Sequence, residues 1–68
     1  MANRVFALVE LVGTSPISIE DAVANALSSP GGCKKADLRW FQIVETRGAI
    51  KDGQVAEWQV TVKVGVKA

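Results

Sequence analysis

The stretch Lys51-Asp52-Gly53-Gln54-Val55-Ala56-Glu57-Trp58-Gln59-Val60-Thr61-Val62-Lys63-Val64-Gly65-Val66 decides the fold. Its Asp-Gly pair is a strong signal for a two-residue β-hairpin turn. Beyond the turn, every second residue from Ala56 to Val66 is apolar, and the residues between them are mostly polar. This alternation predicts a strand over 55–66 with one face in the core and one polar face.

The hairpin predicts a partner strand over 38–47 and a definite register. If Asp52-Gly53 forms the turn, Lys51 faces Gln54 and the pairing continues outward from there. The pairs expected further along are Thr46 with Gln59, Val44 with Thr61, Gln42 with Lys63, and Trp40 with Gly65.

In this register the two tryptophans lie on opposite faces of the sheet. Phe41 and Ile43 join Trp58 on the apolar face, which has to take the helix. Trp40 lies on the polar face, and its expected neighbour Gly65 has no side chain, which leaves the indole plane uncovered. We therefore predict that Trp58 is a core residue and that Trp40 has a different role.

A strand and a helix are predicted before the hairpin. Residues 4–12 are apolar nearly throughout, as in a strand covered on much of both faces, and residues 13–16 form a turn cluster. Ser18 is suited to cap a helix of about three turns, with Asp21 in the capping-box position. Pro30-Gly31-Gly32 cannot continue that helix. Its apolar residues form one stripe: Ile19, Ala22, Val23, Ala26 and Leu27.

The predicted order of elements is β-α-β-β, an α+β fold in one domain over residues 1–68. A right-handed crossover through the helix makes the first two strands parallel. The third strand then lies between them, antiparallel to both, and the sheet wraps around the helix. A chain of 68 residues cannot cover both faces of its first strand. We expect another copy of the chain to supply the second cover.

Composition argues against several classes of protein. The net charge is +1 with no basic run, which gives no footprint for nucleic acid, and no apolar run approaches the roughly 20 residues of a membrane span. The chain has no histidine and one cysteine, Cys33, so we predict no metal site and no disulfide. No nucleophile–base pair or phosphate-binding loop is evident, so we predict no catalytic residues. The lone thiol, and a start at Met1–Arg4 unlike a signal peptide, favour the cytoplasm.

Trp40 and Gln59 are the candidate ligand-binding residues. An open indole can stack a flat heteroaromatic ligand, but tryptophan is also enriched where subunits meet, and the two roles can coexist. The Gln59 amide offers a donor and an acceptor that complement an imide ring edge, although an ordinary exposed strand residue is the simpler reading. The two residues lie about 20 Å apart along the sheet, so a ligand that touches both would bridge two chains.

The whole chain resembles the dodecins. The resemblance is carried by several short segments. No single segment is specific for the family, but their occurrence together, in this order and over a chain of this length, is specific. These segments are Val9-Glu10-Leu11-Val12-Gly13-Thr14-Ser15, Glu20-Asp21-Ala22-Val23, Leu38-Arg39-Trp40-Phe41, Arg47-Gly48, Asp52-Gly53-Gln54-Val55-Ala56 and Trp58-Gln59-Val60-Thr61-Val62-Lys63-Val64-Gly65.

The resemblance implies a hollow homododecamer that stores, buffers and quenches flavins without turning them over. FMN, riboflavin or FAD would bind in pairs at subunit junctions, with FMN the first expectation. By the same resemblance Trp40 sandwiches the isoalloxazine ring, Gln59 hydrogen-bonds to it, and Arg47 lies near the ligand's tail or phosphate. Some members also bind coenzyme A through basic residues near the chain ends, which Arg4 and Lys67 would match.

Two other functions remain open on the sequence. The first is a structural dodecameric shell that has lost flavin binding, since Pro30-Gly31-Gly32 interrupts the helix and the usual acidic tail is missing after Ala68. The second is a small thiol enzyme that uses Cys33, because Lys34 and Lys35 beside it can favour a thiolate.

Overall fold

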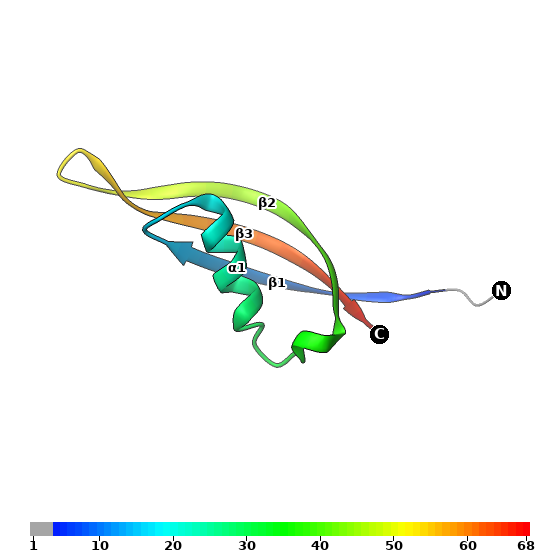
Figure 1. The fold of residues 1–68 in the computed structure, drawn as a ribbon. Coiled ribbons are helices and arrows are strands. Elements are labelled where there is room, and N and C mark those ends of the chain that lie inside the picture. Colours follow the sequence, from blue (N-terminus) through cyan, green and yellow to red (C-terminus); the bar gives the residue numbers. More distant parts are fainter. Residues whose placement is uncertain (1–3) are drawn as a thin grey trace.

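A computed structural model describes residues 4–68, so the prediction that concerns Met1–Asn3 lies outside the described residues. The chain runs through β1 (Phe6–Ser15), α1 (Ile19–Ser28), the 3-10 helix η1 (Lys35–Asp37), β2 (Leu38–Lys51) and β3 (Gln54–Lys67). The strands form one antiparallel sheet in the order β1-β3-β2, and α1 lies across one face of it (Figure 1). The predicted β-α-β-β fold is confirmed. No helix within residues 4–68 has the length and hydropathy needed to cross a membrane.

Both ends of the predicted hairpin register are confirmed. The turn residues Asp52-Gly53 have φ angles of 54° and 74°, as a tight hairpin turn with two left-handed residues requires. Lys51 pairs with Gln54 beside the turn, and Trp40 pairs with Gly65 at the far end. Two register shifts of opposite sense lie between these pairs and cancel, so both strands reach the far end in the predicted alignment.

Between the two shifts the predicted register is wrong by one residue. Gln59 pairs with Arg47 rather than Thr46, and Thr61 pairs with Glu45 rather than Val44. A bulge puts two residues of one strand opposite one residue of the other, and hydrophobic alternation does not reveal where it falls. The bulge therefore places the Arg47 side chain on the same face as Gln59.

The core lies between α1 and the middle of the sheet. Its buried side chains are Ala22, Val23, Ala26, Val60, Val62, Val64 and Val66. The Ser18 hydroxyl accepts a hydrogen bond of 3.0 Å from the Asp21 N–H, which caps the helix as predicted. The Asp21 carboxylate accepts a hydrogen bond of 2.6 Å from the buried Ser15 hydroxyl, rather than from the Ser18 N–H as in a capping box. It therefore ties the end of β1 to the helix.

β1 is longer than predicted because the turn cluster belongs partly to the strand. The strand continues to Ser15, and Gly13 pairs with Val60 and is buried beneath α1. A Cβ atom at Gly13 would overlap the Ala22 carbonyl oxygen and lie 2.8 Å from the Ala26 Cβ. The glycine therefore serves the close approach of helix and strand.

The single helix leaves much of β2 uncovered. Phe41 and Ile43 pair with the buried Val64 and Val62, which confirms their place on the helix side of the sheet. They are nevertheless 48% and 43% exposed, because α1 packs mainly against β1 and β3. The β2–β3 hairpin projects beyond the helix (Figure 1), and the radius of gyration is 13.9 Å. A compact chain of this length would have a radius of roughly 11 Å.

We predict that Gly13→Ala lowers the free energy of unfolding by about 1–3 kcal/mol, because the added methyl group overpacks the contact between β1 and α1. Gly32→Ala is the matched control, since a Cβ atom there meets nothing within 4 Å. It should stay within about 0.5 kcal/mol of the parent chain. Urea unfolding followed by circular dichroism measures both. Equal stability of the two variants would contradict the close approach at Gly13.

Candidate functional site

The candidate ligand-binding residues lie on the sheet face turned away from α1, which we call the outer face. Strand pairing places the following residues on it: Phe6, Leu8, Glu10, Val12 and Thr14 of β1, Trp40, Gln42, Glu45, Arg47 and Ala49 of β2, and Glu57, Gln59, Thr61, Lys63, Gly65 and Lys67 of β3. This face is only partly polar, since Leu8 and Val12 are exposed on it. Trp40, Gln59 and Arg47 all belong to it.

Trp40 lies flat on the backbone of its neighbouring strand. A Cβ atom on Gly65 would overlap the indole ring, and Gly65 is itself buried. The expectation that Gly65 leaves the indole plane uncovered is therefore wrong for one of its two faces: the glycine makes room for the ring to lie down. Phe6 contacts the indole edge-on, with ring centroids 6.0 Å apart and an interplanar angle of 76°. The ring remains 42% exposed.

Arg47 and Gln59 form a hydrogen-bonded pair across the two strands. Arg47 Nε donates to Gln59 Oε1 at 2.7 Å, and Gln59 Nε2 donates to Glu57 Oε1 at 2.9 Å. Gln59 and Glu57 are partly buried, whereas Arg47 is exposed. The two register shifts make this pair possible, because Arg47 lies opposite Gln59 only in the stretch between them.

Within one chain the structure does not bring Trp40 and Gln59 together. Trp40 pairs with Gly65, which is six residues along β3 from Gln59. The predicted separation along the sheet is therefore confirmed. A flat ligand of ordinary size that contacts an indole and an amide of this kind has to take them from two chains.

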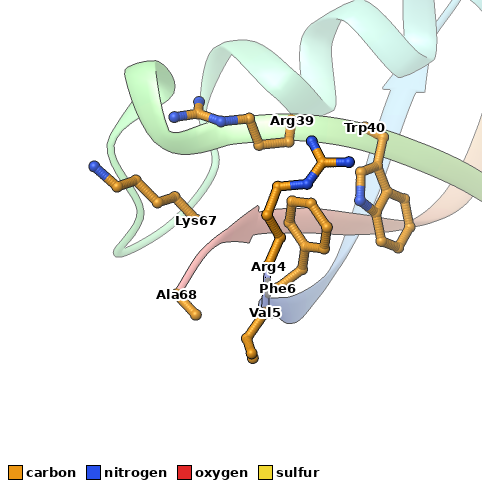
Figure 2. A pocket seen from close by; sticks show the side chains of 7 residues that line it. All are labelled: Arg4, Val5, Phe6, Arg39, Trp40, Lys67 and Ala68. Atoms are coloured by element: carbon orange, nitrogen blue, oxygen red, sulfur yellow. The ribbon is translucent and has the colours of Figure 1, made fainter. Parts of the chain in front are cut away.

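A basic pocket adjoins Trp40 where residues 4–6 lie beside residues 67 and 68 (Figure 2). It has a volume of about 660 Å³, within the usual range for small-molecule sites, and is lined by Arg4, Val5, Phe6, Arg39, Trp40, Lys67 and Ala68. The Arg4 guanidinium lies 6.0 Å from the centre of the Phe6 ring. Arg39 is anchored by a hydrogen bond of 2.6 Å from Nη1 to the Ala36 carbonyl. Three cationic side chains and two aromatic rings thus line one pocket.

Sequence reasoning missed several residues of these sites, among them Phe6, Glu57 and Arg39. Phe6 lies four places before the charged Glu10 on the same strand face, so alternation along β1 was the available signal. Glu57 shares a face with Gln59 by the same rule. Arg39 precedes a register irregularity, and no pattern indicated its place. Trp58 and Cys33 pack against the core, and both are partly buried.

Comparison with known proteins establishes the family. The family model described as Dodecin matches residues 5–68. This chain belongs to the dodecin family. The dodecin of Thermus thermophilus is 39% identical to it over 65 residues, which cover 96% of this chain and 93% of that protein.

Solved dodecins share its fold closely. The structure of dodecin from Streptomyces coelicolor is 40% identical and superposes with a TM-score of 0.87, covering 100% of this chain and 96% of that one. Dodecin from Streptomyces davaonensis is 38% identical with a TM-score of 0.81, covering 98% and 97%. The dodecins are small binding and storage proteins, and members of the family are oligomeric.

We predict that Gly65→Ala displaces the indole of Trp40 toward solvent, because the new methyl group occupies the position of the ring. In a Trp58→Phe background, where Trp40 is the only tryptophan, its fluorescence emission should shift to longer wavelength. Gly32→Ala in the same background should leave the emission unchanged. An unchanged spectrum for Gly65→Ala would mean that the indole does not lie on β3 in solution.

Proposed function

We propose that this dodecin binds flavin for storage and buffering, quenches its fluorescence and performs no turnover on it. The observation that carries the proposal is the Trp40 indole, held flat against Gly65 on one side and open on the other. An aromatic plane held in this way supports stacking of an isoalloxazine ring at little cost in ordering. FMN is the first expectation, with riboflavin and FAD as further candidates.

Gln59 and Arg47 complete the proposed flavin site from another chain. The Gln59 amide suits the imide edge of the ring, and Arg47 supplies a cation beside it for a ligand's tail or phosphate. Because Trp40 lies six residues of β3 away, we assign the two halves of one site to neighbouring subunits of a hollow homododecamer. The cytoplasm remains the predicted location.

Coenzyme A is a second candidate ligand, for the pocket at the chain ends. Arg4 and Lys67 were the residues expected to bind it, and both line this pocket together with Arg39. Cations around exposed aromatic rings suit a ligand that carries both phosphates and a purine. Phe6 and Trp40 supply those rings.

We predict that the wild-type protein strongly quenches the fluorescence of added FMN or riboflavin, because a stacked indole is a good electron donor. Trp40→Phe should retain the fold, lose most of the quenching and bind flavin about three- to tenfold more weakly, since aromatic contacts of this kind contribute about 0.5–1.5 kcal/mol. Trp58→Phe is the matched control and should quench like wild type, because Trp58 packs on the helix side of the sheet. Fluorescence titration measures all three.

Two results would count against flavin storage. Quenching unaffected by Trp40→Phe would remove Trp40 from the site. A particle of twelve times the 7.2 kDa chain mass by light scattering that cannot be loaded with flavin would instead support the structural shell.

We predict that Lys67→Ala weakens coenzyme A binding about two- to fivefold, as expected for one exposed ion pair. Added salt should weaken the wild-type affinity as well, since exposed charges are screened. Lys51→Ala, beside the hairpin turn at the other end of the sheet, is the control and should have no effect. Calorimetric titration measures both variants. An equal loss in both would argue against the pocket at the chain ends.

A further inference from the structure

Glu57, Gln59 and Arg47 form a continuous hydrogen-bonded row on the outer face. Arg47 Nε donates to Gln59 Oε1 at 2.7 Å, and Gln59 Nε2 donates to Glu57 Oε1 at 2.9 Å. Glu57 lies opposite Ala49, whose small side chain leaves room beside it. Gln59 is thus held from both ends of its amide.

The two partners decide which way the amide points. A guanidinium group only donates hydrogen bonds, and an ionised carboxylate only accepts them. Arg47 therefore has to meet the amide oxygen, and Glu57 has to meet the amide nitrogen. Turning the amide over would set donor against donor at Arg47 and acceptor against acceptor at Glu57. Each half of the amide is also polarised by a charge of the opposite sign, which strengthens its remaining hydrogen-bonding capacity.

Each of these contacts leaves one hydrogen-bonding position of Gln59 free. The amide nitrogen has two N–H groups and gives one to Glu57, and the oxygen has two lone pairs and uses one on Arg47. One N–H and one lone pair of the amide therefore remain for a ligand. An imide edge, with its N–H beside a carbonyl, presents the matching acceptor and donor.

We propose that Glu57 is a positioning residue for ligand recognition, which fixes the orientation of the Gln59 amide so that the amide can pair with the imide edge of a flavin. This role rests on the proposed flavin function. Glu57 itself does not touch the ligand: it acts through Gln59, and Arg47 holds the other end. Loss of the carboxylate frees the amide nitrogen to turn, so part of the bound population presents the wrong edge.

The test compares riboflavin with N3-methylriboflavin, which lacks the imide N–H, by fluorescence titration of the assembled protein. Wild type should bind riboflavin more tightly than the methylated ligand. Glu57→Ala should weaken riboflavin binding about three- to tenfold, the usual effect of one net hydrogen bond, and leave binding of the methylated ligand nearly unchanged. Glu57→Gln keeps an acceptor oxygen and should stay within about twofold of wild type.

Glu57→Lys is a second disruptive variant for the case in which Glu57→Ala does not fold. Its ammonium group only donates, so it competes with Arg47 for the amide oxygen and leaves the amide nitrogen without an acceptor, and the preference for riboflavin should be lost. Equal weakening of both ligands, an unchanged preference in Glu57→Ala and Glu57→Lys, or failure of Glu57→Gln to restore it would each overturn the positioning role alone. A wild-type protein that binds neither ligand would overturn the flavin function, and the role of Glu57 with it.

Discussion

One ten-residue helix packs on a three-stranded sheet and is too short to cover it. Most features of the surface follow from the apolar side chains that the helix leaves exposed. The helix packs mainly against β1 and β3, with Gly13 allowing its close approach. The accessible surface is 4954 Å², whereas a compact monomer of this mass would expose roughly 4,100 Å². Apolar side chains are exposed on β2, on the outer face and on the projecting hairpin, where Ile50 and Val55 pair with each other. Members of the dodecin family are oligomeric, and in an oligomer neighbouring subunits can cover such side chains.

The strand order and the ends of the hairpin could be predicted because their signals are local. Asp52-Gly53 needs left-handed backbone at both positions, and the alternation from Ala56 to Val66 identifies the face that takes the helix. The end of β1 could not be predicted in this way. Gly13 looks like part of a turn beside Pro16, yet its role depends on the position of a helix that comes later in the chain.

The middle of the hairpin was mispredicted for a different physical reason. A bulge changes the register without changing the composition of either strand, and the two shifts here are opposite, so the far end looks undisturbed. Trp40 was therefore placed correctly, while Arg47 was placed one residue away from its partner. The stretch between the two shifts is what lets Arg47 and Glu57 hold the Gln59 amide between opposite charges. In the proposed site, the Gln59 amide that recognises the edge of the ring therefore depends on the register shifts, which the sequence does not reveal.

The two halves of the proposed site lie apart on the same rigid strand. The Gly65 end of β3 carries the stacking surface of Trp40, and the Gln59 end carries the hydrogen-bonding row. A β-strand cannot fold back to bring these ends together, so only assembly can do so. Such a ligand binds the assembled form and not the isolated chain, and mass action then makes it stabilise the assembly. In an oligomer, the apolar surface that one helix leaves uncovered would thus also bring the two halves of the proposed site together.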